Sequence, residues 1–291
     1  MGATRQLQLD PLDSTFGAVV RGIEIRSLDD DTFRALHDAW LEYALLIFPG
    51  QHLTQPEQNA FAERFGALEF PATPISNIGS DGSIHSQPDD DTVKSLRGNE
   101  GWHHDSTYMP VQAKGAVFSA EIVPSEGAAT GFADMAAAYE SLDQAARDHL
   151  STLSAHHSLY YSQERAGYLP TRRNEQGGYN QYGYHDGPVP LRPIVKVHPD
   201  TGRPNLLIGR HAHDIAGLDP TASERLLDRL NEDACAPTRT YHHQWTVGDT
   251  VIWDNRRLMH RATPYDMTER RRMWHTRIAG ERPSELAANY S

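Results

Sequence analysis

Two histidines and an aspartate stand side by side in the segment "WHHDSTY" at residues 102–108. On an extended strand, side chains two positions apart point to the same face, so His103 and Asp105 would point one way and His104 the other. An imidazole nitrogen and a carboxylate oxygen on one face can bind a metal ion, but two ligands are too few for iron or zinc. The segment therefore predicts part of a metal site, with His104 as a core or supporting histidine outside it.

A third ligand is available in "WDNRRLMHRATPYD" (253–266), where His260 follows an apolar, strand-like run. Two histidines and one carboxylate on Fe(II) leave adjacent coordination positions open, which a bidentate cosubstrate and dioxygen can take. His260 is far from His103 in sequence, so the two would come from different strands that converge at the mouth of a barrel. The sequence therefore predicts a metal site formed by His103, Asp105 and His260.

A cosubstrate on such a metal needs a cation, and Arg271 lies eleven residues past His260. If the chain turns at "PYDMTE" and returns, Arg271 comes back toward the metal. A guanidinium binds a carboxylate through paired hydrogen bonds. Its neighbours Arg270 and Arg272 would point to the opposite strand face, as solvated or ion-paired side chains.

Composition limits the class of protein. Net charge is −12, so the protein as a whole repels phosphate backbones, and we expect no nucleic-acid partner. The single cysteine, Cys235, forms no internal disulfide, which fits a reducing compartment. The first residues lack the apolar core of a signal peptide, and no apolar run is long enough to cross a bilayer. We therefore expect a cytoplasmic protein without a membrane partner.

Apolar spacing and capping residues predict both helices and short strands. The expected helices are 29–44, 54–66, 134–153 (one helix or two) and 219–234. The expected strands are 17–25, 45–54 and the segments "GAVFSAEIVP", "PIVKVHP", "PNLLIG", "DTVIWDN" and "MWHTRIAG". No repeat and no clean linker divides the chain. We therefore expect a single α+β domain over residues 1–291, mainly β in its core, built around a β-sandwich or barrel.

Residues 160–190 differ in composition from the rest of the chain. They hold six tyrosines, five glycines and three prolines without a sustained period. Long segments of this kind in compact domains are commonly lids or insertions. The tyrosines favour a lid that packs against the site, and a surface insertion without a role is the alternative.

Several motifs together resemble the TauD/TfdA family of Fe(II)/2-oxoglutarate-dependent dioxygenases. The resemblance runs from about residue 15 to 280. It is carried by "WHHDSTY", "WDNRRLMHRATPYD", "RRRMWHTR", "GAVVRGIEI", "LLIFPGQHLT", "FAERFG", "HPDTGRPNLLIG" and "HAHDIAGL". The segments "ISNIGSDG" and "IGRHAHDIAGL" are more similar to the 2,4-dichlorophenoxyacetate dioxygenases than to the taurine dioxygenases.

This resemblance implies a double-stranded β-helix (jelly roll) core with flanking helices. It implies His103, Asp105 and His260 as iron ligands, and Thr130 with Arg271 as the binding site of 2-oxoglutarate. In the implied reaction, O2 and 2-oxoglutarate give succinate and CO2, and a second, small and mostly apolar substrate is hydroxylated, desaturated or epoxidised. This substrate could also carry a carboxylate. Relatives commonly form homodimers or homotetramers.

The sequence departs from the family pattern at two places. The turn before the threonine is usually Gly-Gly-Asp-Thr, and here it is "GAAT", in which Ala128 predicts an ordinary backbone conformation. Where many members carry a substrate-binding arginine, this chain has His275, with Arg277 two residues on. Strand alternation predicts that His275 points into the pocket and that Arg277 lies at its rim.

Other substrate candidates and two alternative functions stay open. His211 is a candidate for the pocket lining, and Asn77, His85 and Asn99 lie where family members place substrate-side residues. A zinc hydrolase uses the same ligand types, although it has no evident need for Arg271. A non-catalytic 2-oxoglutarate sensor would keep the same scaffold and bind 2-oxoglutarate without consuming it.

Overall fold

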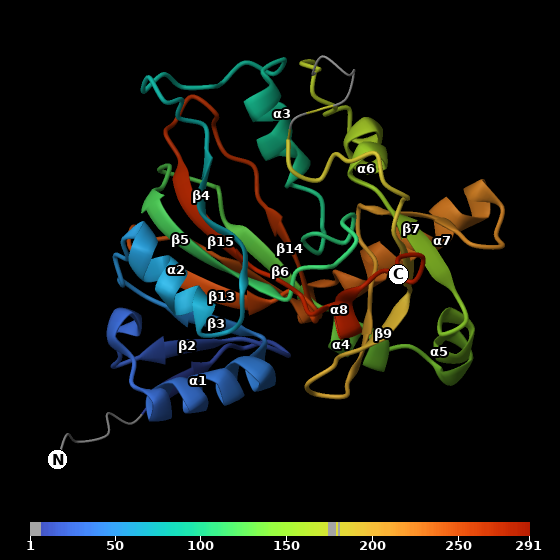
Figure 1. Cartoon of the computed structure of the whole chain (residues 1–291), viewed down its shortest axis with the longest axis horizontal. Coiled ribbons are helices and arrows are strands. Elements are labelled where there is room, and N and C mark those ends of the chain that lie inside the picture. Colours follow the sequence, from blue (N-terminus) through green and yellow to red (C-terminus); the bar gives the residue numbers. More distant parts are fainter. Residues whose placement is uncertain (1–6, 174–178, 180) are drawn as a thin grey trace.

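The computed structural model describes residues 7–173, 179 and 181–291 (Figure 1). Two β-sheets form its centre. The large sheet has seven strands in the order β1 (Gln8–Pro11), β2 (Ala18–Arg21), β3 (Leu45–Phe48), β13 (Thr250–Asp254), β5 (Gly115–Ile122), β15 (Arg272–Ile278) and β4 (Leu68–Ser76). The smaller sheet has the order β12 (Thr240–His243), β6 (Thr130–Asp134) and β14 (Leu258–Ala262). Strands distant in sequence are neighbours in both sheets, which is the jelly-roll arrangement.

The two sheets face each other across a shared apolar core. Phe118 of β5, Trp253 of β13 and Met273 of β15 come from the large sheet, while Phe132 of β6 and Leu258 of β14 come from the smaller one. All five are buried. This contact fixes the distance between β14, which carries His260, and β15, which follows Arg271.

Helices cover the outer face of the large sheet. Helices α1 (Asp30–Tyr43) and α2 (Gln55–Glu63) pack on that face through residues such as Trp40 and Phe61 (Figure 1). Asp29 caps α1 through the Thr32 amide, and Thr54 and Glu57 form a capping box at the start of α2. The predicted helices 29–44 and 54–66 are therefore confirmed.

A second group of elements extends the molecule beyond the smaller sheet. It comprises helices α4 (Met135–Glu140), α5 (Gln144–Leu150) and α7 (Pro220–Ala234), the strand pair β9 (Val195–Val197) and β10 (Pro204–Leu206), and the three-stranded sheet of β11 (Ala212–Ile215), β7 (Ser154–His157) and β8 (Leu191–Pro193). The predicted region 134–153 is two helices, and α7 matches the prediction 219–234.

Some sequence predictions of elements were wrong. The predicted strand 17–25 ends at Arg21, and a short 3-10 helix, η1 (Ile25–Ser27), follows it. Helix α3 (Asp91–Gly98) was missed, and so was α6 (Leu159–Arg165), which occupies the start of the segment 160–190. Two further short elements complete the structure. The 3-10 helix η2 (Pro237–Arg239) precedes β12, and the short helix α8 (Arg282–Glu285) follows β15. Among the described residues, no helix is long and apolar enough to span a membrane.

The segment 160–190 packs against the body of the protein where it is described. Tyr182 packs edge-on against Phe70 of β4 at 5.4 Å and against Tyr108 at 6.2 Å, and within the segment the rings of Tyr160 and Tyr184 are 4.8 Å apart. Residues 174–178 and 180 lie outside the described part of the chain. Closure of this segment over a substrate stays a prediction.

Candidate active site

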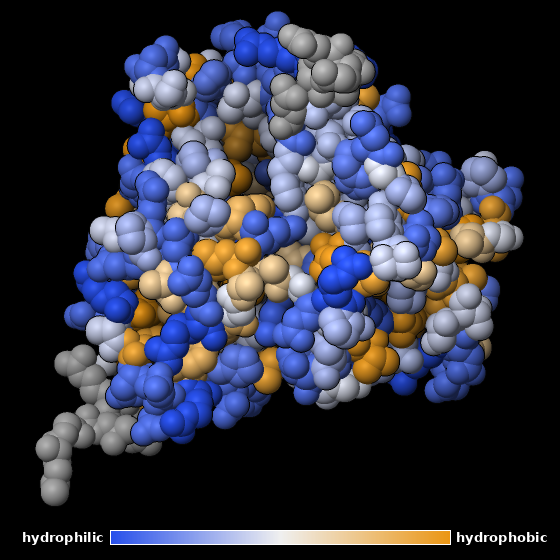
Figure 2. Space-filling view, in the orientation of Figure 1, coloured by the Kyte–Doolittle hydropathy of each residue, from blue (hydrophilic) through white to orange (hydrophobic). Residues whose placement is uncertain are grey.

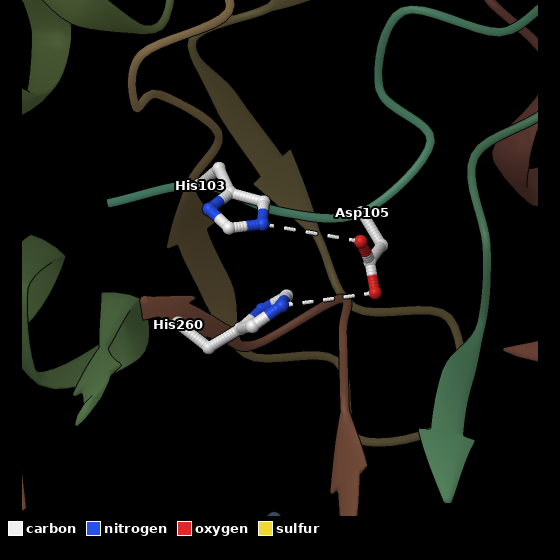
Figure 3. A group of neighbouring side chains, drawn as sticks. All are labelled: His103, Asp105 and His260. Carbon is white, nitrogen blue, oxygen red and sulfur yellow. Dashed lines mark ion pairs between the residues drawn. The ribbon is translucent and has the colours of Figure 1, made fainter. Parts of the chain in front are cut away.

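Three predicted ligands meet at one point between the two sheets (Figure 3). His103 forms an isolated bridge with His260 of β14, with N–H···O distances of 3.0 and 2.8 Å between their backbones. The two rings therefore lie close together, with centroids 4.3 Å apart and planes inclined at 47°. Asp105 lies to one side of both rings, with Oδ1 4.0 Å from His103 Nε2 and Oδ2 3.8 Å from His260 Nε2 (Figure 3). One ligand atom from each of the three residues lies within 4.8 Å of the other two.

The local structure around Asp105 differs from the predicted strand. Only His103 is strand-paired, and the chain turns at Ser106, whose φ is +56°. Asn255 holds this turn, because its Oδ1 accepts from the Asp105 amide at 2.7 Å and its Nδ2 donates to the Asp105 carbonyl at 3.0 Å. His103 and Asp105 nevertheless meet as expected. His104 points away, with Nδ1 2.7 Å from the Asn255 carbonyl oxygen.

The protonation states of the triad suit a divalent metal ion. Burial lowers the pKa of His103 to about 4 and that of His260 well below its ordinary value, so both imidazoles are neutral. His103 Nδ1 lies 2.7 Å from the Gly101 carbonyl; a hydrogen bond there leaves the Nε2 lone pair free for a metal. Burial alone would raise the pKa of Asp105, but Arg277 and the surrounding histidines outweigh it and hold the pKa below its usual range. Asp105 Oδ2 is buried without a hydrogen-bond partner among the described residues, as a metal-ligating oxygen would be before the ion binds.

Arg277 is buried directly behind Asp105, which corrects the prediction that it lies at the rim. Its Nη2 donates to Asp105 Oδ1 at 2.8 Å and its Nη1 to Ser106 Oγ at 3.0 Å. The guanidinium also lies over the rings of Phe70 and Tyr182, at 4.7 and 5.2 Å. Strand alternation is confirmed, because His275 and Arg277 line the cavity while Thr276 between them bonds to α2. The backbone register against β4 shifts at this point, which brings Arg277 inward.

The triad lies in a cavity of about 120 Å³ whose walls are mainly aromatic and aliphatic. In the orientation of Figure 1, the surface is hollowed next to α3, and apolar side chains are visible inside the hollow (Figure 2). Besides the triad, the predicted residues that line the cavity are Thr130, Arg271, His275, Arg277, His211 and Asn99. The apolar lining, which sequence reasoning did not assign, includes Ile75, Leu96, Tyr108, Phe118, Leu159, Ala262, Tyr265 and Met267. Trp253 also lines it and stacks on His275, with ring centroids 5.7 Å apart.

Two predicted substrate residues lie elsewhere. Asn77 is fully buried and supports the backbone around Arg271: its Oδ1 accepts from the Arg271 amide at 2.9 Å, and its Nδ2 donates to the Met267 carbonyl at 2.9 Å. His85 Nδ1 lies 2.7 Å from Asp90 Oδ2, at the start of α3. Neither residue lines the cavity, so we propose no contact with the substrate for either of them.

Arg271 is a buried cation in the wall of the cavity. It is 3% exposed, and its guanidinium has no carboxylate partner among the described residues. It lies 6.0 Å from the ring centre of Phe118 and 5.7 Å from that of Tyr265. Burial lowers its pKa to about 10, so it remains charged at neutral pH. Burying an unpaired guanidinium is costly, which indicates that an anion completes this site.

Thr130 begins β6 after a turn whose backbone differs from the prediction. Ala128 has φ +55°, a left-handed conformation rather than an ordinary one. The Ala128 amide donates to the Pro264 carbonyl at 3.3 Å, and Gly127 at φ +75° lies so close that an added Cβ would be 2.4 Å from the same oxygen. Contact with the loop after β14 therefore overrides the preference of alanine and places Thr130 in the cavity wall.

The ligand set alone does not separate an oxygenase from a zinc hydrolase, since both can use two histidines and a carboxylate. The additional feature here is the unpaired, buried guanidinium in the same cavity. A dicarboxylate cosubstrate that binds the metal with one end and a cation with the other requires such a pair of sites, and a hydrolytic water does not. Fold and site together define the class of non-heme Fe(II)- and 2-oxoglutarate-dependent oxygenases.

Comparison with known proteins identifies the family. Residues 8–277 match the model described as taurine catabolism dioxygenase TauD, TfdA family, and the chain belongs to this family. It is 60% identical to (S)-phenoxypropionate/alpha-ketoglutarate-dioxygenase of Sphingobium herbicidovorans over 95% of this chain and 96% of that protein. It is 34% identical to the alpha-ketoglutarate-dependent 2,4-dichlorophenoxyacetate dioxygenase of Cupriavidus pinatubonensis over 91% and 94% of the two chains.

A solved structure gives the same answer for the fold. The crystal structure of AAD-2 in complex with Mn(II) and N-oxalylglycine superposes with a TM-score of 0.88 at 33% identity and covers 98% of this chain and 100% of that one. The protein is thus an Fe(II)/2-oxoglutarate-dependent dioxygenase with a jelly-roll core, as the sequence predicted, and its cosubstrates are 2-oxoglutarate and O2. The alternatives of a zinc hydrolase and of a non-catalytic sensor receive no support from these relatives.

Proposed function

We propose that His103, Asp105 and His260 hold the iron and that Arg271 and Thr130 bind the distal carboxylate of 2-oxoglutarate. The observation that carries this assignment is the Asp105 carboxylate, which faces two neutral imidazoles and has an orphaned Oδ2, in one cavity with the unpaired Arg271. When bound, the iron supplies activation of dioxygen for the oxidative decarboxylation of 2-oxoglutarate to succinate and CO2. The chain's own residues supply position: Asn255 fixes Asp105, Asn77 fixes the backbone of Arg271, and the aromatic walls exclude water.

The prime substrate we propose is a small aryloxyalkanoate, an aromatic ether with one carboxylate. Relatives over nearly the whole chain are named for such substrates. The aromatic and aliphatic lining suits the ring. His211 is the polar group that we propose beside the carboxylate, because it lines the cavity and its Nδ1 is anchored 2.8 Å from Ser162 Oγ. Burial, and then Arg277, lower the pKa of His275 to about 3, so it offers a hydrogen bond rather than a charge.

The proposed outcome is hydroxylation of the carbon that carries the ether oxygen. One oxygen atom of O2 enters the substrate C–H bond and the other enters succinate. The product is a hemiketal or hemiacetal, which breaks its bond to the aryloxy group and releases a phenol together with a keto or aldehyde acid. Asn99 lines the same cavity and would contact the substrate.

We also propose that residues 1–291 form one domain, that the segment 160–190 closes over the substrate, and that the protein is a cytoplasmic homodimer or homotetramer. The packing of Tyr182 on Phe70 and on Arg277 supports the closing role, because it links the segment to the wall of the site. The single Cys235 supports the cytoplasmic location.

The test is turnover of racemic 2-phenoxypropionate with Fe(II), 2-oxoglutarate and O2. We expect succinate and phenol in equal amounts, from one enantiomer in excess, and neither product from the His103→Ala variant. Taurine serves as the control substrate and should release no sulfite. Succinate without phenol would show that the dioxygenase assignment holds but the aryloxyalkanoate does not.

A further inference from the structure

The hydroxyl of Thr130 already has one hydrogen-bond partner, and it is a donor. Trp245 Nε1 lies 3.0 Å from Thr130 Oγ1, and both residues are buried, at 8% and 4% exposed. An indole N–H can only donate, so the hydroxyl oxygen must accept. The hydroxyl hydrogen is then free to donate to another group, and no residue of the described part of the chain accepts a hydrogen bond from it. The bond therefore sets the polarity of Thr130 before any ligand arrives.

The indole is itself held rigidly. Phe118 packs edge-on against it at 5.4 Å and His243 at 4.5 Å. The corner between β12 and β13, which carries Trp245, is fixed by Asp249: its carboxylate accepts from the Thr246 amide at 3.0 Å and from the Gly50 amide at 3.2 Å, and lies 3.3 Å from His243. A donor fixed in this way keeps Thr130 oriented without further cost when the ligand binds.

We propose that Trp245 is a positioning residue for 2-oxoglutarate, which acts through Thr130 by directing its hydroxyl hydrogen at the distal carboxylate. This inference rests on the proposed function, in which Arg271 binds the same carboxylate. The ring of Phe118 lies beside both groups, 5.4 Å from the Trp245 ring and 6.0 Å from the Arg271 guanidinium carbon. Trp245 does not touch the cavity itself, so its effect reaches the ligand only through the threonine.

The test measures direct binding of 2-oxoglutarate to Mn(II)-loaded protein by calorimetry, without turnover. Trp245→Phe keeps a ring in place and deletes the N–H, and it should raise Kd by roughly 3- to 10-fold, the usual effect of one buried hydrogen bond. In the active enzyme the same variant should raise KM for 2-oxoglutarate by a similar factor and leave kcat within about 2-fold. Trp274→Phe is the matched control, because that indole donates to Glu121 on the surface, and it should change neither value.

A double-mutant cycle separates positioning from general support. Thr130→Val removes the hydroxyl, and in that background Trp245→Phe should weaken binding no further. In a Thr130→Ser background, which keeps the hydroxyl, the effect of Trp245→Phe should persist. If Trp245→Phe does not fold, 3-benzothienylalanine at position 245 removes only the N–H from a bicyclic ring of nearly the same shape, and the same binding change is expected.

The outcomes that overturn the inference are distinct from failure of the proposed function. Binding of 2-oxoglutarate unchanged in Trp245→Phe, or fully additive effects of the two substitutions, would remove Trp245 from cosubstrate positioning while the wild type still binds. If the wild type itself binds no 2-oxoglutarate, the assignment of the site is wrong and the role of Trp245 is overturned with it.

Discussion

Replacing Arg271 by methionine should change ligand binding and apo stability in opposite directions. Methionine fills a similar volume and keeps contact with Phe118 and Tyr265, but it removes a guanidinium that is 3% exposed and has no carboxylate partner in the described ranges. Loss of a buried, unpaired charge costs the apo protein nothing and relieves desolvation. Loss of the same charge removes the partner of the 2-oxoglutarate carboxylate.

The magnitude follows from the geometry of a guanidinium facing a carboxylate. Two charge-assisted hydrogen bonds at ~1.5–3 kcal/mol each amount to about 3–6 kcal/mol, or roughly 100- to 20,000-fold in Kd. Calorimetry with Mn(II)-loaded protein measures this directly. Thermal unfolding provides the second readout: at 100 times its Kd, 2-oxoglutarate stabilises the wild type by about 2.7 kcal/mol, or roughly 5 °C, and should not stabilise the variant.

A neighbouring arginine provides the control. Arg272→Met carries the same substitution one position away, on the other strand face, where Arg272 pairs with Glu121 at 3.2 Å. Its 2-oxoglutarate affinity should stay within about 2-fold of wild type, because a surface ion pair contributes little. A change in Kd of less than 5-fold in Arg271→Met would show that Arg271 does not bind the 2-oxoglutarate carboxylate, and an apo variant that melts well below wild type would show that the buried guanidinium is not a destabilising charge.

Three further predictions concern the framework of the site. Arg277→Met should weaken Mn(II) binding by about 10- to 100-fold, measured by the free-ion electron paramagnetic resonance signal, because Asp105 loses its orienting partner; unchanged affinity would contradict this. Asp254→Asn should lower the free energy of unfolding in urea at neutral pH by about 1.5–3 kcal/mol, because buried Arg256 keeps Asp200 but loses the charge of Asp254 and one of the two bonds it donates to that side chain. Burial alone would raise the pKa of Asp254, but Arg256 and His198 hold it below the usual 3.8. Its contribution is therefore present above pH 3.8 and lost as pH falls further, and the asparagine variant should show a flatter acid limb. Gly127→Ala should destabilise the protein by about 1–3 kcal/mol, because it adds a Cβ against the Pro264 carbonyl. Ala128→Gly should stabilise it by about 0.5–1 kcal/mol, because it relieves an alanine in the left-handed conformation. Shifts of the melting temperature in the same direction for both variants would contradict this description of the turn.

Features decided by local chemistry could be predicted from the sequence. Helices α1, α2 and α7 have side-chain caps and apolar residues at helical spacing, so their existence follows from short windows. Helix α3 was missed because it is short and mostly polar, and its apolar contacts are to a distant residue: Val93 and Leu96 pack on Met267. Its stability is tertiary rather than local.

The same division holds for the site. The ligand types and the arginine could be recognised because each has a chemical role that few other residues can fill. The burial of Arg277 could not, because it depends on the turn at Ser106 and on a register shift between β15 and β4, two features of distant segments. Likewise, the left-handed Ala128 is imposed by the Pro264 carbonyl, which a propensity argument at residues 127–130 does not contain.

An anaerobic titration of the Fe(II)-loaded protein with 2-oxoglutarate tests whether His103, Asp105 and His260 hold iron beside a 2-oxoglutarate bound by Arg271. We expect a weak visible charge-transfer band that saturates at one equivalent per protein chain, is absent in His103→Ala, and needs at least about 100-fold more 2-oxoglutarate in Arg271→Ala. No band in folded, iron-loaded wild type, or an unchanged band in His103→Ala, would contradict the assignment of iron and 2-oxoglutarate to this site.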